Sequence, residues 1–466
     1  MSRIRNVDLP GEAEALSLLE DALRGSPADQ TELVLLAERT EVTRYANSEI
    51  HQHVAQLNTR VSVRVAVGRA TARVFTNSLE TDDLRQAVQD AVRLARLQSP
   101  NPRFRSLPTP DMGYPPNPNP PQSYFESTAA MSPQARAEAV GVVIDAAAQE
   151  GFQTFGTYRT SASGLAVVSS TGIRSHAAFT TAYLKALVEG PGGTGFSDAL
   201  DRDASRIDPR RVAAQAVAKC RANHTQMEVE PGEYEAVFEP NAVADMVRFP
   251  VVWGMGARQV LDGQSFMSGR IGQQVAADCV TIRDDPTDPR CMPLAIDFEG
   301  LPATPVDIIV SGVAKGPVYD TQTALEAGTR STGHAADPFT DSPPDPLPDH
   351  IVMPVGTAPA QDLITRVSRG VWVTRFHYTH CPDRKRVIAT GTTRDGTFLI
   401  LDGQVVGALK NLRLEMGVLE LLSSMQEAGE GKLCQDWWAA NGMGTTYYFV
   451  PAMRFAACRF TGVTTF

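Results

Sequence analysis

Three residues with metal-binding side chains lie close together near the end of one predicted strand. His377, His380 and Cys381 belong to the sequence HYTHC, the densest gathering of imidazole and thiol groups in the chain. Zinc prefers such nitrogen and sulfur ligands, but a zinc site also needs a third or fourth ligand in a held orientation. If residues 371–378 form a strand, His377 lies within it and the other two lie in the turn beyond. We therefore favour an ordinary polar strand end, with a metal cluster as the alternative.

Other common catalytic patterns are missing from the sequence. No histidine is followed by glutamate, so the H-E-x-x-H zinc motif is absent, as are the G-x-S-x-G elbow and the Walker phosphate loop. The glycine-rich segment 190–195 does not precede a predicted helix, and we interpret it as flexible or as a place where two backbones approach closely. The acidic run 284–288 lacks the ligand spacing of a calcium loop and is more typical of a solvated turn.

The composition is that of a globular protein. The chain has 466 residues, of which 42% are hydrophobic, and 43 Lys and Arg against 53 Asp and Glu give a net charge of −10. An acidic balance argues against a nucleic-acid binder and against a polybasic membrane-surface protein. We see neither an apolar run long enough to cross a membrane nor a secretion signal, and the six scattered cysteines favour reduced thiols. These features predict a cytoplasmic protein.

The first half of the chain combines helices and strands. Valines at every second position from 61 to 67 predict a half-buried strand, with Arg60 and Arg64 on its other face. This strand should belong to a hairpin over 54–76, and a strand-rich passage should follow at 157–188. Apolar spacing and capping residues such as Ser132 and Asp208 predict helices over 11–24, 80–97, 133–149 and 208–221.

The second half is richer in short strands. After the turn at Pro231 and Gly232, a strand is expected at 234–239 and a helix at 241–262. Further strands are predicted at 279–284, 306–319, 371–378, 386–391, 397–401 and 446–460, with helices near 360–369 and 411–427. Proline-rich connections are expected at 100–121 and 336–354. The fold class is α+β, with a mixed α/β domain at 1–228 and a strand-dominated domain at 229–466.

Several stretches resemble the TldD/PmbA family, also called the TldD/TldE family. In order along the chain they are 46–68, 161–173, 238–247, 263–275, 284–289, 331–335, 370–380 and 389–413. They cover most of the chain in the family's own order. The resemblance implies a two-domain fold of the TldD/PmbA type.

The resemblance also locates the place where a family zinc site would lie. TldD-type subunits carry H-E-x-x-x-H on the helix after the first strand of the second domain, whereas TldE (PmbA) subunits lack it. An ungapped placement puts Arg248, Phe249 and Trp253 at the three motif positions. None of these side chains has a lone pair to donate to a metal. Cys434 is nearest to the family's cysteine ligand, but its surroundings match poorly and the role is not carried over.

This resemblance implies a TldE-type, non-catalytic chain without a metal or cofactor of its own. Its partner would be a zinc-bearing TldD-type subunit, and the heterodimer would be a metallopeptidase acting on unfolded, linear peptides. An extended substrate would bind by strand addition. We expect substrate contacts at Arg60 and Arg64, and at Arg394 and Asp395 in a turn over 393–396.

Two alternatives belong to other functional classes. In the first alternative, the chain acts alone as a homodimeric amide or peptide hydrolase in a biosynthetic pathway, with Trp437, Trp438, Tyr447 and Tyr448 lining a pocket. In the second alternative, the chain is a peptide-binding module without catalysis. Metal content and peptide binding of the isolated chain separate these functions.

Overall fold

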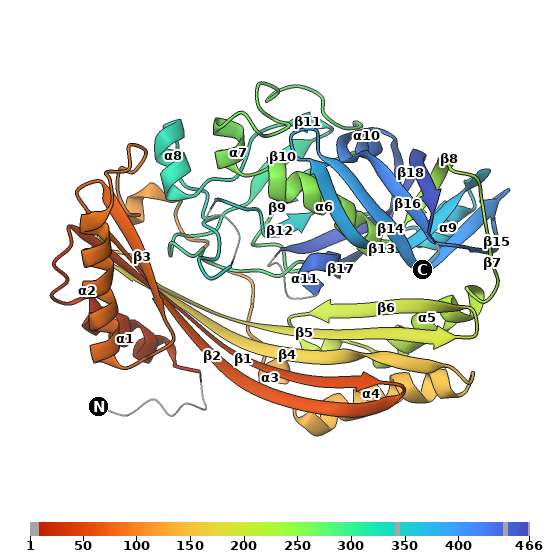
Figure 1. Ribbon diagram of the computed structural model, residues 1–466, viewed down its shortest axis with the longest axis horizontal. Coiled ribbons are helices and arrows are strands. Elements are labelled where there is room, and N and C mark those ends of the chain that lie inside the picture. Colours follow the sequence, from red (N-terminus) through yellow and green to blue (C-terminus); the bar gives the residue numbers. More distant parts are fainter. Residues whose placement is uncertain (1–8, 341–344, 441–445, 465–466) are drawn as a thin grey trace.

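The structure is a computed structural model that describes residues 9–340, 345–440 and 446–464. A six-stranded antiparallel sheet in the order β3-β2-β1-β4-β5-β6 dominates the first half (Figure 1). Its strands are β1 (Gln30–Ala46), β2 (Glu49–Val67), β3 (Ala70–Thr76), β4 (Gln153–Ser169), β5 (Arg174–Gly190) and β6 (Gly193–Asp201). β6 lies at one edge of this sheet and faces the second half of the chain.

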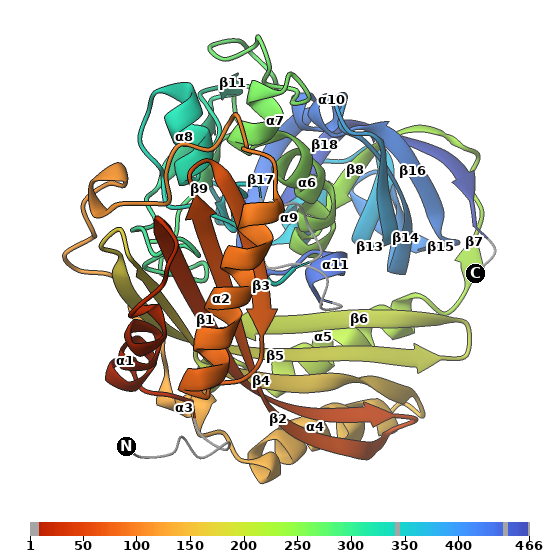
Figure 2. The ribbon, with the colours of Figure 1, turned by 60° about the vertical axis from the view of Figure 1, so that its left-hand side comes forward.

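Helices cover one face of this sheet. They are α1 (Glu12–Leu23), α2 (Thr81–Leu97), α3 (Glu126–Ala129), α4 (Pro133–Ala148) and α5 (Pro209–Ala222). Figure 2 shows α1 and α2 in front of the first strands, and their apolar residues form a core with Leu33 and Leu35 of β1. Ser132 accepts a hydrogen bond from Ala135 N at 3.1 Å and Asp208 accepts one from Arg210 N at 2.9 Å. Both residues therefore cap their helices as the sequence predicts.

A 12-stranded sheet forms the second half. Its strands are β7 (Gln226–Met227), β8 (Gly232–Phe238), β9 (Ile282–Asp284), β10 (Val306–Val310), β11 (Val313–Ala314), β12 (His350–Val352), β13 (Arg369–Asp383), β14 (Ile388–Leu401), β15 (Gln404–Leu409), β16 (Leu412–Gly417), β17 (Met425–Cys434) and β18 (Tyr447–Val463). The helices here are α6 (Pro240–Gly254), α7 (Ala257–Leu261), α8 (Thr321–Ala327), α9 (Ala360–Ile364), α10 (Val418–Ser423) and α11 (Trp437–Ala440). Short 3-10 helices lie at Pro110–Met112 and Ala204–Arg206. The α+β class is confirmed, and the division at residue 228 stays a prediction.

Apolar side chains join the two halves. Val34 and Val167, on the sheet face opposite α1 and α2, pack against Ile296 and Leu301 of the second half. Within the first half, β6 and α5 also approach each other closely, because a Cβ added at Gly195 would lie 2.1 Å from the carbonyl oxygen of Ala216 in α5. The interpretation of 190–195 as a backbone-approach segment is therefore confirmed.

Several expectations for individual elements were wrong. The helix near 411–427 is instead a strand, the short helix α10 and the start of another strand, because Leu412, Leu414 and Met416 are buried alternately with exposed neighbours. The helix expected at 241–262 is two helices, α6 and α7. The two strands at 386–391 and 397–401 form the single strand β14. Part of the expected connection 336–354 lies outside the described residues.

Sequence reasoning also missed β1, the strand at the centre of the first sheet. It pairs with β2 and β4, and both faces are covered along Leu33–Ala37. A strand buried on both faces shows a continuous apolar run, which lacks the alternation that reveals a half-buried strand.

We expect Phe238→Ala to destabilise the protein strongly. The Phe238 ring is 0% exposed and lies 5.2 Å from the ring of Phe376 and 5.1 Å from that of Phe455, between centroids. Its removal leaves a cavity and should lower the free energy of unfolding by about 3–5 kcal/mol in urea denaturation. Phe75→Ala is the control, since Phe75 is 54% exposed. Equal losses for both variants would contradict this packing.

Candidate functional site

The helix that would carry the family zinc motif holds an ion pair at the first motif position. The Arg248 Nε lies 3.2 Å from Asp436 Oδ1, and the guanidinium lies 5.3 Å from the centre of the Trp438 ring. Asp436 is 2% exposed and also accepts hydrogen bonds from the backbone nitrogens of Trp438 and Ala439. A fixed cation therefore lies where a metal ligand would be expected.

The other two motif positions are also engaged in packing. Phe249 is 1% exposed within the main core of the second half. The guanidinium of Arg384 lies 3.8 Å from the centre of the Trp253 ring, a cation–π distance. Within 9–340, 345–440 and 446–464, no three His, Cys, Asp or Glu side chains gather in a way that would hold a metal ion. The side chains at these three positions do not fit zinc.

Asp245, one turn earlier on α6, ties neighbouring elements to this helix. Its carboxylate accepts hydrogen bonds from Phe376 N at 2.9 Å and from Trp437 N at 2.7 Å. Burial raises the pKa of Asp245 to about 8, and the nearby Asp436 contributes in the same direction. The position of α11 therefore depends on two carboxylates, one on α6 and one just before α11.

In the described structure, the two histidines of the HYTHC segment pack against tryptophan rings and do not form a metal site with Cys381. The ring of His377 lies 5.2 Å from that of Trp437, and the ring of His380 lies 5.8 Å from that of Trp438. Burial, with Arg394 and Arg375 nearby, lowers the pKa of His377 to about 4. Burial raises the pKa of the Cys381 thiol to about 11, so it is not a thiolate at neutral pH. β13 also continues to Asp383, so His380 and Cys381 lie in the strand and not in a turn beyond it.

Cys434 lies within the core of the second half. It is 0% exposed, and burial holds the pKa of its thiol well above the ordinary value. All six cysteines are free of disulfides, as the sequence predicts.

Two of the predicted peptide contacts, Arg60 and Arg64, face the second half of the chain. Arg64 forms an ion pair of 3.3 Å with Glu299, and the Arg60 guanidinium lies 4.9 Å from the centre of the Phe339 ring. Both arginines thus contact residues from the second half.

The other two predicted contacts, Arg394 and Asp395, do not lie in a tight turn. They belong to an irregular point inside β14, where Asp395 has φ 57° and the pairing with β13 shifts. Asp395 is 2% exposed and accepts hydrogen bonds of 2.6 Å from Thr194 Oγ1 and from Arg375 Nε. Its closest approach to Arg394 is 4.0 Å. The expectation of a turn was wrong, because a bulge uses the same left-handed conformation as a turn.

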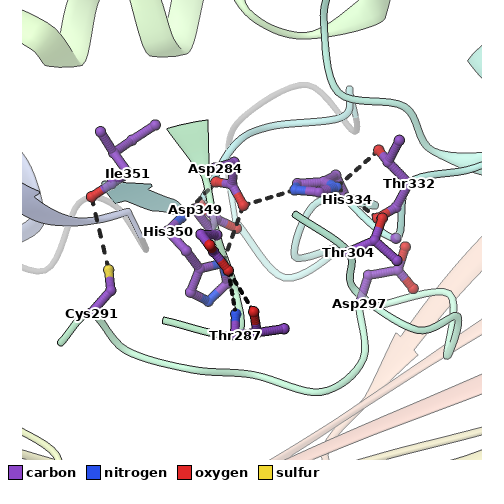
Figure 3. Close-up of polar contacts among 12 residues, drawn as sticks. Asp284, Thr287, Cys291, Asp297, Thr304, Thr332, His334, Asp349, His350 and Ile351 are labelled. Atoms are coloured by element: carbon purple, nitrogen blue, oxygen red, sulfur yellow. Dashed lines mark hydrogen bonds and ion pairs between the residues drawn. The ribbon is translucent and has the colours of Figure 1, made fainter. Parts of the chain in front are cut away.

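A buried acid–imidazole network that sequence reasoning missed joins three segments of the second half (Figure 3). His334 Nε2 lies 2.8 Å from Asp284 Oδ1, and its Nδ1 lies 2.9 Å from Thr332 Oγ1. The backbone nitrogen of His350 donates to Asp284 Oδ2 at 2.7 Å. Asp284 is 0% exposed, so the expectation of a solvated acidic turn was wrong for this residue. Asp284 and His334 are 50 positions apart in the sequence, and only the fold brings their side chains together.

The network shifts both titrating groups toward their charged forms. Burial opposes ionisation of Asp284, but His334 and His350 hold its pKa well below the ordinary value. Burial likewise opposes protonation of His334, and the charge of Asp284 raises its pKa. Because the pair is enclosed, we assign it a structural role.

A cleft of about 1100 Å³ lies beside β6. One wall consists of residues 196–202 and the exposed side of α5, and the other consists of residues 289–293, the start of α6 and part of β17. Asp198 forms an ion pair with Lys432 in this cleft, and Asn241 Nδ2 donates to the same carboxylate at 3.1 Å. Lys219 Nζ lies 2.6 Å from Glu239 Oε2. The cleft is large enough for an extended peptide segment.

We expect Asp284→Asn to remove a pH-dependent part of the stability. The lowered pKa of Asp284 contributes stability above the unfolded carboxyl pKa of about 3.9, which is lost as pH falls through the folded value. The raised pKa of His334 contributes stability below the unfolded imidazole pKa of about 6.5, which is lost as pH rises through the folded value. The free energy of unfolding of the variant should therefore be lower by about 3–5 kcal/mol, and the difference should be largest between about pH 4 and 6.5.

Urea unfolding across this pH range measures the loss. Asp82→Asn is the control, because Asp82 is 95% exposed and should leave the profile unchanged. A uniform loss at every pH would contradict the role of the ion pair.

Comparisons with known proteins agree on one family. The PmbA/TldA metallopeptidase C-terminal domain matches residues 231–462, and the PmbA/TldA metallopeptidase domain 1 matches residues 31–95. A metalloprotease of Methanothermobacter thermautotrophicus is 25% identical over 238 residues, which cover 51% of each chain. A metalloprotease TldD homolog of Buchnera aphidicola is 28% identical over 200 residues, covering 39% of this chain and 41% of that protein. These matches span about half or less of the relatives' length.

Solved structures share the fold over nearly the whole chain. TldE from Thermococcus kodakarensis superposes with a TM-score of 0.85 at 21% identity, covering 96% of this chain and all of that one (100%). A putative modulator of DNA gyrase from Thermotoga maritima has a TM-score of 0.79 at 16% identity, covering 93% and 96% of the two chains. No helix among the described residues has the length and apolarity needed to cross a membrane. Because two domain models of one family match residues 31–95 and 231–462, the chain belongs to the PmbA/TldD family.

Proposed function

We propose that this chain is a TldE-type subunit that pairs with a zinc-bearing TldD-type subunit to form a peptidase acting on linear peptides. The observation that carries the proposal is the occupation of the motif positions on α6. Arg248 is paired with Asp436, Phe249 is in the core, and Trp253 is covered by Arg384. A guanidinium, a phenyl ring and an indole offer no lone pair to zinc. We place the metal in the partner and the complex in the cytoplasm, which the unpaired cysteines support.

The contribution of this chain would be to hold the substrate. β6 is the last strand of its sheet, and the residues along it line the cleft. An unpaired strand edge can hydrogen-bond to an extended peptide through backbone groups, which makes recognition tolerant of sequence. Arg60 and Arg394 remain proposed contacts for other parts of the substrate, whereas Arg64 and Asp395 already have partners within the chain.

A peptide-binding role without any catalytic partner is the second candidate. It is favoured by the cleft between β6 and the second half of this chain, which has the size of a peptide site. An independent homodimeric hydrolase would need catalytic groups in this chain. Trp437, Trp438 and Tyr378 form an aromatic cluster that would suit substrate packing.

Zinc content and cleavage test the proposal together. The isolated chain should carry far less than one zinc, and the reconstituted complex about one zinc per pair of chains, by mass spectrometry of the metal. An unstructured peptide should be cleaved only by the complex, and a chelator should abolish the cleavage. About one zinc in the isolated chain with peptide cleavage would contradict the proposal and favour the homodimeric hydrolase. Peptide binding without any effect on a zinc-bearing subunit would favour the binding module.

Arg248→Ala provides a second test. Loss of the guanidinium leaves the buried Asp436 without its ion-pair partner, so the free energy of unfolding should fall by about 3–5 kcal/mol. The zinc content of the variant should stay as low as that of the unaltered chain. Arg386→Ala is the control, because Arg386 is exposed. A variant that keeps full stability, or that acquires zinc, would contradict the role assigned to Arg248.

A further inference from the structure

Arg202 is a buried cation without an acidic partner. It directly follows β6, is 5% exposed and lines the cleft. Its guanidinium donates to the carbonyl oxygens of Thr180 at 3.2 Å and Pro293 at 2.6 Å, and it lies 5.3 Å from the centre of the Phe179 ring. Its Nε has no hydrogen-bond partner. Among residues 9–340, 345–440 and 446–464, no carboxylate lies within ion-pair distance of it.

This arrangement differs from that of the other deeply buried arginine. Arg136 is 1% exposed, and its guanidinium pairs with Glu41 at 2.7 Å. Buried charges are normally paired, because removing an ion from water is costly. Burial lowers the pKa of Arg202 only to about 10, so the group stays charged at neutral pH. Among the described residues, this positive charge in the cleft wall therefore has no direct ion-pair partner, and the neighbouring Asp201 acts on it only from farther away.

The surroundings of Arg202 suit an anionic group at the end of an extended chain. Arg206, Arg211 and Arg290 line the same cleft. Arg206 and Arg290 are partly neutralised by Asp203 and Asp288, while Arg211 lies exposed on α5. Asp201, which also lines the cleft, has its pKa raised by burial and accepts a hydrogen bond from Asp203 N at 2.9 Å. A peptide paired with the free edge of β6 would bring one of its ends to this region.

We propose that Arg202 forms a carboxylate subsite in which a negatively charged group of an extended peptide pairs with the buried guanidinium. The fork of N–H donors on arginine matches the two oxygens of a carboxylate. The carboxylate comes from the C-terminus of the peptide or from an Asp or Glu side chain near that end. The inference rests on the proposed function only for the peptide nature of the ligand.

Fluorescence anisotropy with three labelled peptides tests the subsite on the full chain. The peptides share one unstructured sequence and end in a free carboxylate, in an amide, or in a glutamate followed by an amide. We expect at least one carboxylate form to bind roughly ten- to a hundredfold more tightly than the plain amide. Preference for the free acid alone identifies the C-terminus as the source, and a gain with the glutamate identifies a side chain. Equal binding of all three peptides, or binding of none, overturns the subsite.

Variants connect the preference to Arg202. Arg202→Met should abolish the preference for the carboxylate, and Arg202→Lys should keep part of it. Arg210→Met removes the same charge from an exposed position on α5 outside the cleft and should leave the preference unchanged. A preference retained by Arg202→Met overturns the assignment. If that variant does not fold, Arg202→Lys decides: a weakened preference supports the assignment, and an unchanged preference overturns it. Zinc content and cleavage by the complex are measured in separate experiments. A failure of the subsite therefore does not contradict the proposed pairing with a zinc-bearing subunit.

Discussion

The ion pair between Arg248 and Asp436 is the interaction on which the rest of the site depends. It places a permanent positive charge on α6 and holds the segment before α11 against that helix. Asp245 fixes the same segment through Trp437 N, and the indole nitrogen of Trp438 donates to Thr379 O at 3.1 Å. Asp245 and Asp436 thus both have defined partners, as a low-dielectric interior favours. This part of α6 is therefore organised as a packed contact and not as an open ligand set.

The cleft follows from the way in which the two sheets meet. β6 ends one sheet, and its outer edge has no strand partner within that sheet. Close approach at Gly195 lets α5 pack directly against β6, while Thr194 on the same strand hydrogen-bonds to Asp395 of β14. Polar contacts such as Asp198 with Lys432 then connect β6 to β17. These contacts fix the position of the second sheet relative to β6. The strand edge, the charged side chains and a pocket of peptide size therefore occur in one place.

Local signals revealed much of the fold and less of the site. Capping by Ser132 and Asp208 and the valine alternation before Gly68 are local properties, so those helices and the hairpin could be predicted. β1 could not, because burial on both faces removes its periodicity. Arg248, Phe249 and Trp253 could be placed only through family resemblance. Three features of the site could not be predicted, because each joins segments that are distant in sequence and therefore leaves no local periodicity or spacing. They are the pairing of Asp284 with His334, the contact of His377 with Trp437, and the burial of Arg202 against Pro293.

Anomalous diffraction at the zinc absorption edge, on crystals of the complex with a zinc-bearing subunit, tests the central claim most directly. The account predicts a zinc peak on the partner's motif helix and no peak near Arg248, with the guanidinium still paired to Asp436. A zinc peak beside α6 of this chain, with Arg248 displaced from Asp436, would contradict it.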